Sequence, residues 1–300
     1  MHQWQHLVVD VEQAVDVSLG MRVADIVGRE NQNASGKHFL KEESLGCPGT
    51  RLRRIGDVEK TPAWMAADGY HVAAVHRNYA ATVSFREQLM GDNLDPLKAT
   101  EAGRILNRTK TRTGSYDLGH GHMLNWSDRA NVAAIPLSER EPELLKQFPE
   151  GFVKWMVRRG RVLTTFPNFL INDVASTAIR VWRPVSVNDT ELETWCFAPV
   201  GESPKVREAR IRKFEDFFFP SSLAVPDDIA AMEGAQEGSA ATGMGWVEFS
   251  RGREFGKDGA DDAAEDMGIV PATSNGQGDS EMCFFGFYRR WLELMSAPQS

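Results

Sequence analysis

Three side chains within nine residues have the types and spacing to do chemistry: Asp68, His71 and His76, in the order D-x2-H-x4-H. Two neutral imidazoles and one carboxylate on one side of a metal form the ligand set of mononuclear non-haem Fe(II), and they leave the opposite side open for O2 and substrate. The bare motif is weak evidence, because a histidine among valines and alanines is more often a hydrogen-bonded core residue. The segment therefore indicates a candidate metal site whose support must come from the rest of the chain.

The spacing of the motif restricts its geometry. His71 and His76 are five positions apart, so on an ideal helix their directions would differ by about 140°. Both can reach one metal only if the helix is distorted between them, for example by a π-bulge. Asp68 is about 60° from His71 on the same surface, which places it as an acceptor for the free ring N–H of a histidine ligand.

A second acidic pair, Asp227 and Asp228, follows Pro226 at the start of an expected helix. One of them could be a metal ligand, or both could be present because the helix dipole favours acids in the first turn. Adjacent helical residues point about 100° apart, so only one of the two can face a metal.

Four other polar residues have weaker claims. His120 and His122 are two apart in an expected strand and would face the same side, where a structural hydrogen bond is favoured over a place in a pocket. Arg180 and Arg183 could meet a substrate carboxylate, but pairing at the surface or within a hairpin is the favoured interpretation.

The elements that must position these residues are an α+β set. Strands in the middle of the chain, with helices before and after them, indicate an antiparallel sheet and argue against a βαβ fold. Residues 1–64 show weak periodicity. The patterns predict a helix over 65–90, a strand over 114–127, a helix over 141–161 broken by Pro149 and Gly151, a strand over 161–173, a hairpin of 176–187 and 190–200 around Asn188-Asp189, helices over 203–219 and 226–238, a loop over 251–280 and a helix over 281–297.

Composition excludes several classes of function. A net charge of -8 and the lack of a Lys/Arg run argue against a nucleic-acid partner. The apolar stretches are far shorter than the ~20 residues that span a bilayer, and the N-terminus has no signal-peptide pattern. Cys47, Cys196 and Cys283 form no C-x2-C pair, so we expect neither a disulfide framework nor a zinc ribbon, and a cytoplasmic location fits.

Several segments, in order, resemble one family. The segment DGYHVAAVHRNYAAT is similar to the iron-binding segment of Rieske-type ring-hydroxylating dioxygenase α subunits, in the branch that acts on benzoate, toluate and related aromatic acids. Further similarities cover about residues 65–300: the strand with Phe166-Pro167-Asn168, the hairpin Arg183-Pro184…TELETWCF, the helix with Pro226-Asp227-Asp228 and Gln236, and the terminal FYRRWLELM. Trp64 and Met65 depart from the Glu-Asn usual before the histidine motif.

The resemblance implies a fold and a site. The fold is a helix-grip-like (TBP-like) antiparallel sheet with covering helices, in a mononuclear-iron catalytic domain over 65–300. Fe(II) would be held by His71, His76 and Asp228, the last favoured because it lies eight residues before Gln236. The same correspondence leaves Asp227 to accept main-chain N–H groups at the start of the helix. Asp68 would connect the iron electronically to the [2Fe–2S] centre of a neighbouring subunit.

It also implies a reaction and partners. The expected reaction is cis-dihydroxylation of an aromatic, carboxylated ring by O2, with electrons that come ultimately from NADH through a reductase or ferredoxin. The expected partner is a small β subunit, in an assembly of three large and three small subunits.

The family's [2Fe–2S] ligands, C-x-H and C-x2-H, are absent from this chain. We therefore expect that residues 1–64 are not a Rieske domain. Two explanations stay open: a truncated or frameshifted product, or a Rieske domain on another chain. The alternative function is a non-catalytic remnant or a metal-free module of the same fold that binds hydrophobic ligands. A zinc hydrolase is a weak third reading, because no H-E-x-x-H adjoins the histidines.

Overall fold

The structure is a computed structural model of the chain, and it describes residues 50–53, 68–100, 111–135, 137–186, 189–239, 243 and 248–296. The predicted boundary between 1–64 and 65–300 falls outside these residues and stays a prediction. Within them, no helix is long and apolar enough to cross a membrane.

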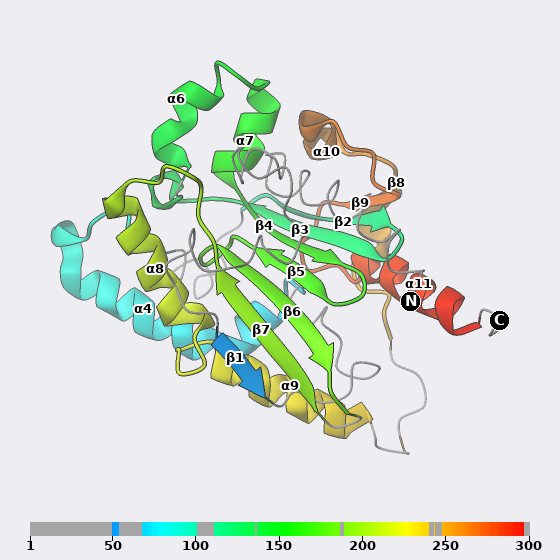
Figure 1. Ribbon diagram of the computed structural model, residues 1–300. Helices are drawn as coiled ribbons and strands as arrows, with labels where there is room; N and C mark the ends of the chain where they lie inside the picture. Colours follow the sequence, from blue (N-terminus) through cyan, green and yellow to red (C-terminus); the bar gives the residue numbers. More distant parts are fainter. Residues whose placement is uncertain are drawn as a thin grey trace, which may run out of the picture.

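One antiparallel sheet organises the described part of the chain (Figure 1). Its nine strands follow the order β1-β7-β6-β5-β4-β3-β2-β9-β8. They are β1 (Thr50–Arg53), β2 (Thr113–Gly119), β3 (His122–Asp128), β4 (Arg159–Thr165), β5 (Phe169–Asn172), β6 (Ala178–Pro184), β7 (Thr190–Cys196), β8 (Gly256–Asp258) and β9 (Thr273–Asn275). The predicted α+β class with an antiparallel sheet is confirmed.

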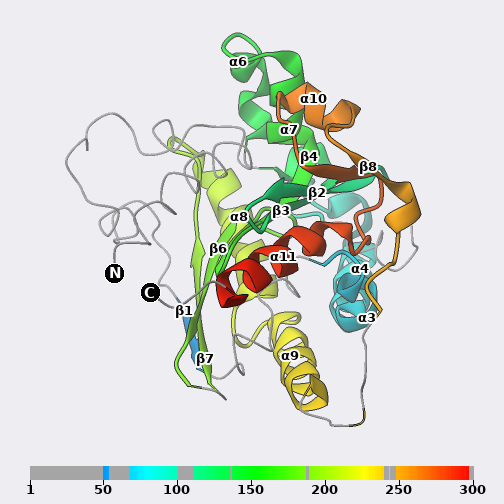
Figure 2. The same cartoon turned by 90° about the vertical axis from the view of Figure 1, so that its right-hand side faces the viewer.

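The helices gather on the two faces of this sheet. They are α3 (His71–Val75), α4 (Arg77–Met90), α6 (Glu141–Leu144), α7 (Glu150–Arg158), α8 (Pro204–Phe218), α9 (Val225–Ser239), α10 (Asp262–Met267) and α11 (Met282–Ser296), with 3-10 turns η3 (Gly91–Asn93), η4 (Val132–Ala134), η5 (Ser138–Arg140) and η6 (Arg253–Phe255). Figure 2 shows α9 and α11 on one side of the strands β6 and β7.

Strand alternation divides the core into two layers. Leu163 on β4 pairs with Leu124 and Ile171 of its neighbours, and this set packs with Trp155 of α7 and Ala264 of α10. The positions one residue along point to the opposite face. There, buried side chains of four strands pack against α9 and α11. The strand residues are Met123, Leu170, Trp182 and Leu192, and the helix residues are Met232, Cys283 and Phe284. The metal-site residues described below lie on this second face, which α9 and α11 cover.

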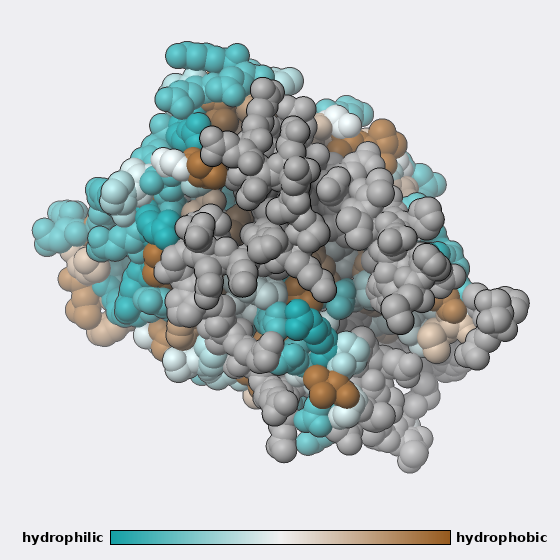
Figure 3. Space-filling model, viewed as in Figure 1, coloured by the Kyte–Doolittle hydropathy of each residue, from teal (hydrophilic) through white to brown (hydrophobic). Residues whose placement is uncertain are grey.

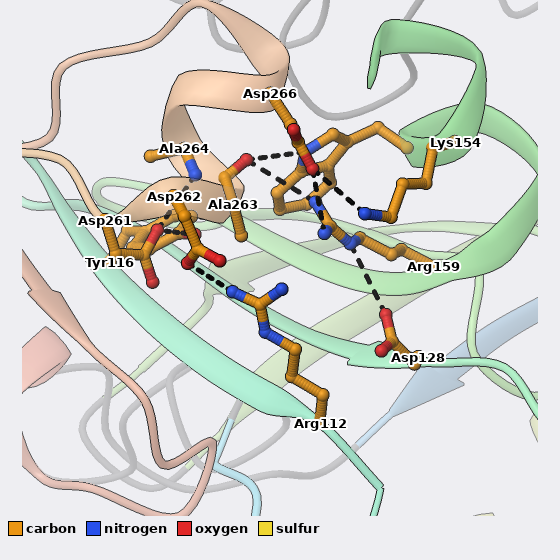
Figure 4. Close-up of polar contacts among 11 residues, drawn as sticks. Arg112, Tyr116, Asp128, Lys154, Arg159, Asp261, Asp262, Ala263, Ala264 and Asp266 are labelled. Atoms are coloured by element: carbon orange, nitrogen blue, oxygen red, sulfur yellow. Dashed lines mark hydrogen bonds and ion pairs between the residues drawn. The ribbon is translucent and has the colours of Figure 1, made fainter. Parts of the chain in front are cut away.

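A buried arginine fastens the first layer at one end. The guanidinium of Arg159 lies 4.6 Å from the ring centroid of Trp126 and 4.4 Å from that of Trp155. It also reaches the carboxylates of Asp128 and Asp266 (Figure 4). Two aromatic faces and two acids thus accompany the burial of this charge, and they tie β4 and α7 to α10.

Two predicted strands are each two strands. The single strand expected over 114–127 is wrong, because the chain reverses at Gly119, His120 and Gly121, all with positive φ, between β2 and β3. Likewise, the strand expected over 161–173 turns at Pro167 and Asn168 between β4 and β5. His120 therefore lies in a turn, while His122 is buried and its Nδ1 accepts a hydrogen bond from the Phe166 N–H at 3.1 Å.

The loop expected over 251–280 also contains regular structure. Asp261 caps α10 by accepting the Ala264 N–H at 2.8 Å, and Gly268 ends that helix with φ 74°. β9 then pairs with β2 and with β8. The helix predicted over 141–161 is confirmed as α6 and α7 with a break before Pro149, but Gly151 lies inside α7 and residues 159–161 belong to β4. The helix predicted over 65–90 is the pair α3 and α4, and the helices predicted over 203–219, 226–238 and 281–297 and the β6–β7 hairpin are confirmed.

Candidate metal centre

The helix that carries the histidines is interrupted at one residue. α3 ends at Val75, His76 has φ -92° and ψ 23°, and α4 begins at Arg77. The ring centroids of His71 and His76 consequently lie only 5.1 Å apart, at an interplanar angle of 76°. The predicted distortion is confirmed, but it is a break between two helices at His76 and not the π-bulge given as an example.

A carboxylate from the far end of the chain joins the two rings. Asp228 Oδ1 lies 3.0 Å from His76 Nε2 and 3.7 Å from His71 Nε2. Asp228 and His76 are buried, at 5% and 1% exposure. The structure therefore brings Asp228, and not Asp227, to the histidines.

The beginning of α9 is held by a different residue from the one we expected. Ser222 Oγ accepts the N–H groups of Ala224 and Val225 at 3.2 and 3.1 Å. Asp227 lies inside the first turn of α9. The hydroxyl of Ser222, closer to the free N–H groups, thus provides the cap for which Asp227 was a candidate.

Asp68 fixes the orientation of His71. Its carboxylate accepts the main-chain N–H of His71 at 2.6 Å, and its main-chain oxygen lies 2.8 Å from His71 Nδ1. A carbonyl oxygen can only accept, so Nδ1 must carry the ring proton. The lone pair is therefore on Nε2, the atom that faces Asp228.

The charges around the site support this arrangement. Burial opposes protonation of His71, but the hydrogen bond and charge of Asp68, together with the charge of Asp228, outweigh it and raise the pKa of His71. Burial also acts to raise the pKa of Asp228, yet His76, Arg180 and His71 together hold that pKa below its ordinary value. The carboxylate of Asp228 is consequently ionised at neutral pH.

The donor set fits a divalent metal. His71, His76 and Asp228 each offer one ligand atom, all within 4.8 Å of one another, and among the described residues these three are the group that meets this condition. Ligand bonds of about 2.1 Å could join one ion to donor atoms that are as far apart as the 3.0 and 3.7 Å observed. Two nitrogens and one oxygen on one side are the combination found with non-haem iron.

An aromatic wall covers His76. The ring of Phe217, at the end of α8, lies 5.1 Å from the ring of His76, and Tyr79 lies 4.9 Å from Phe217. No residue type in the run Phe217-Phe218-Phe219 pointed to the metal centre. This contact depends on the way in which α8 meets α4.

The two arginines considered from the sequence differ. Arg183 forms two hydrogen bonds with Glu193, of 2.7 and 2.9 Å, as the hairpin interpretation predicted. Arg180 is buried at 3% exposure, so surface pairing is wrong for this residue. Burial lowers its pKa, and the nearby carboxylate of Asp228 opposes that effect.

A groove of about 630 Å3 lies outside this site, between α4 and α8. Charged side chains such as Arg86, Glu87 and Arg212 line it together with apolar ones such as Val83 and Ile211. In Figure 3, hydrophilic and apolar surfaces alternate over this part of the molecule. None of the metal-site residues lines the groove.

Comparison with known proteins is consistent with this geometry. The family model described as "Ring hydroxylating alpha subunit (catalytic domain)" matches residues 60–297. The 2-halobenzoate 1,2-dioxygenase large subunit of Burkholderia cepacia is 37% identical over 229 residues, 76% of this chain and 48% of that protein. The toluate 1,2-dioxygenase subunit alpha of Pseudomonas putida is 34% identical over 230 residues, 76% of this chain and 49% of that protein. The chain thus matches about half the length of these relatives.

Solved structures share the fold. A naphthalene 1,2-dioxygenase with indole bound superposes with a TM-score of 0.62 at 18% identity, over 85% of this chain and 55% of that one. A variant of naphthalene 1,2-dioxygenase bound to phenanthrene gives a TM-score of 0.68 at 15% identity, over 98% and 61% of the two chains. The sheet and its covering helices therefore have the arrangement of that catalytic domain.

Proposed function

The chain belongs to the family of ring-hydroxylating α subunits, of which it carries the catalytic domain, and from this membership we propose that it is the oxygenating part of an aromatic-ring dioxygenase. The observation that carries the proposal is the convergence of His71, His76 and Asp228 from two distant parts of the chain. These residues would hold mononuclear Fe(II), which when bound supplies the activation of O2.

The protein's own residues prepare the site. Asp68 holds His71 with Nε2 free, and Asp228 supplies the ionised carboxylate. Phe217 packs beside His76 and keeps water from that side of the ring. A metal held by these three protein ligands could also bind O2 near the substrate.

The substrate class follows from the relatives, whose names refer to 2-halobenzoate, toluate and anthranilate. We infer a carboxylated aromatic ring, to which both oxygen atoms of O2 are added to give a cis-dihydrodiol. NADH supplies the electrons through a reductase or ferredoxin and a [2Fe–2S] centre. A small β subunit would complete the assembly, and Asp68 would connect the metal centre electronically to the cluster of a neighbouring subunit.

Metal analysis of matched variants tests the ligand set. The chain loaded with Fe(II) under anaerobic conditions should retain about one iron per molecule, whereas Asp228→Ala and the double variant His71→Ala/His76→Ala should retain almost none. Asp227→Ala is the matched control and should load as the parent does, because Asp228 and not Asp227 reaches the histidines.

Nitric oxide, a probe for O2, tests whether the bound iron has open positions. The Fe(II)-loaded chain should give the high-spin electron paramagnetic resonance signal of an iron nitrosyl, and benzoate should change that signal. Iron that is bound but does not react with nitric oxide would contradict the proposal and favour a non-catalytic remnant. Equal iron in the parent and the double histidine variant would place the metal elsewhere.

A further inference from the structure

Arg180 lies on β6, an interior strand of the sheet, on the face that α9 and α11 cover. Along β6 the side chains of Ala178, Arg180 and Trp182 point to this face. In the neighbouring strands the residues paired with Arg180 are Leu170 of β5 and Thr194 of β7. Ala178 packs with α8, and Trp182 packs with α9 and α11. Arg180 therefore lies between two apolar clusters, at a place where a charge is costly.

Three polar groups in this region have no hydrogen-bond partner among the residues that the structure describes. Arg180 Nε, Trp182 Nε1 and Thr194 Oγ1 are buried and form no hydrogen bond with the described residues. The residues themselves are 3%, 3% and 1% exposed. Buried polar groups are nearly always satisfied, and each of these three can donate a hydrogen bond. A cluster of unpaired donors calls for an acceptor.

The cluster belongs to the same region as the metal centre. The guanidinium carbon of Arg180 lies 5.6 Å from the ring centroids of both Trp182 and Phe218. Phe218 in turn contacts Phe217 at 4.8 Å, and Phe217 covers His76. Asp228, one of the candidate metal ligands, also attracts the positive charge of Arg180.

The charge of Arg180 has one acidic neighbour in the described part of the chain. Within the described residues its guanidinium makes no ion pair, and Asp228 is the single acid that contributes to its electrostatic environment. A divalent metal on Asp228 would take up the charge of that carboxylate. A buried guanidinium would then remain without a counter-ion, which is strongly unfavourable, unless a ligand brings one.

We propose that Arg180, with the hydroxyl of Thr194 and the indole N–H of Trp182, binds the carboxylate of the aromatic-acid substrate. The proposal rests on the function proposed above and names the residues that select the substrate. A guanidinium holds a carboxylate through two parallel N–H···O bonds, and the flanking aromatic side chains Trp182 and Phe218 would surround the apolar ring. Substrates without a carboxylate would leave the donors unsatisfied, so the site discriminates by charge.

Equilibrium binding to the Fe(II)-loaded full chain, kept without O2, tests this assignment. The probes are benzoate and its neutral isostere benzamide, followed by calorimetry. The parent should prefer benzoate. Arg180→Met should weaken benzoate binding about 10- to 100-fold, with little change for benzamide, and Arg180→Lys should restore part of the preference.

Arg183→Met is the matched control, since it removes a positive charge three residues away on the exposed end of the same strand. It should leave both affinities unchanged. Thr194→Val is the second variant and is nearly isosteric. It should weaken benzoate binding about three- to tenfold even if Arg180→Met fails to fold.

Iron content, measured on every variant, separates this proposal from the one on which it rests. A parent that holds no iron yet prefers benzoate over benzamide supports the carboxylate site and contradicts the proposed function. Iron-loaded Arg180→Met that binds benzoate as tightly as the parent would falsify the carboxylate site. Loss of iron from Arg180→Met, with unchanged benzoate binding in Thr194→Val, would show instead that Arg180 serves Asp228, and would overturn the proposal as well.

Discussion

At the scale of single residues, Asp68 controls the tautomer and the protonation of His71 in the metal centre. The main-chain oxygen of Asp68 selects the tautomer of His71, and its carboxylate raises the pKa of the ring. The two effects oppose each other in function. The first presents Nε2 to a metal, whereas the second lets a proton compete for the same nitrogen.

The pH dependence of iron uptake follows from this opposition. Because the pKa of His71 in the metal-free fold is raised above 6.5, Fe(II) uptake should begin to fail as the pH decreases through that raised value. Asp68→Asn keeps the main-chain carbonyl and an acceptor for the His71 N–H, but removes the negative charge. Its uptake midpoint should therefore move to lower pH, as measured by iron retained after anaerobic equilibration at a series of pH values.

The same pKa gives a stability effect of known sign for the metal-free protein. A pKa raised by folding contributes stability that is fully present below the unfolded value of about 6.5 and is lost as the pH rises through the folded value. The contribution should be smaller in Asp68→Asn.

An iron-uptake midpoint that is the same in Asp68→Asn as in the parent would contradict the role given to this carboxylate.

At the scale of elements, two helices on the same face of the sheet carry glycines in different surroundings. α11 passes over β2 at Gly286, where an added Cβ would collide with the carboxylate of Asp117. That carboxylate is held in place by the N–H of Gly119 at 2.8 Å. In α9, by contrast, a Cβ at Gly234 would meet nothing within 4 Å. One helical glycine is required by packing and the other is not.

Alanine substitutions at the two glycines should therefore have opposite effects. Gly286→Ala should lower the free energy of unfolding by about 1–3 kcal/mol, because α11 or Asp117 must move. Gly234→Ala should leave it unchanged or raise it by about 0.5–1 kcal/mol, the difference in helix propensity. Urea denaturation of both variants measures the two values. A loss of stability in Gly234→Ala as large as in Gly286→Ala would contradict this distinction, because helix propensity favours alanine at both positions.

At the scale of the whole molecule, the metal centre joins segments that are far apart in the chain. His76 and Asp228 are separated by 228 − 76 = 152 positions, and they belong to α3–α4 and to α9, which the sheet brings together. A metal site that is built from such distant elements exists only in the folded state. The free energy of metal binding therefore adds to the stability of the entire fold.

Metal loading should accordingly raise the thermal midpoint of the chain. With free Fe(II) at 100 times its Kd, the added stability is about 2.7 kcal/mol, which corresponds to roughly 5–10 °C for a domain of this size. Scanning calorimetry under anaerobic conditions gives the shift. Asp228→Ala should show almost none, while Asp227→Ala should show the full shift. Equal shifts in these two variants would mean that the stabilising metal binds at another place.

The sequence by itself determined most of the helices, the β6–β7 hairpin and the α+β class, since these depend on local periodicity and turn residues. Its resemblance to the iron-binding segment also singled out His71, His76 and Asp228. It missed the reversal at His120. It also missed the three-residue strands β8 and β9, because β9 exists only through pairing with β2 and β8 only through pairing with β9. Local pattern contains no information on such partners.

Only the tertiary structure decided how the side chains of the site are directed and what surrounds them. Asp227 and Asp228 are chemically identical, and the phase of α9 against α3 and α4 brings only the second to the histidines. Arg180 and Arg183 stand three residues apart in one strand, yet one is enclosed under the helices and the other pairs at the hairpin edge. Burial is set by long-range packing, so residue type and spacing alone do not determine it.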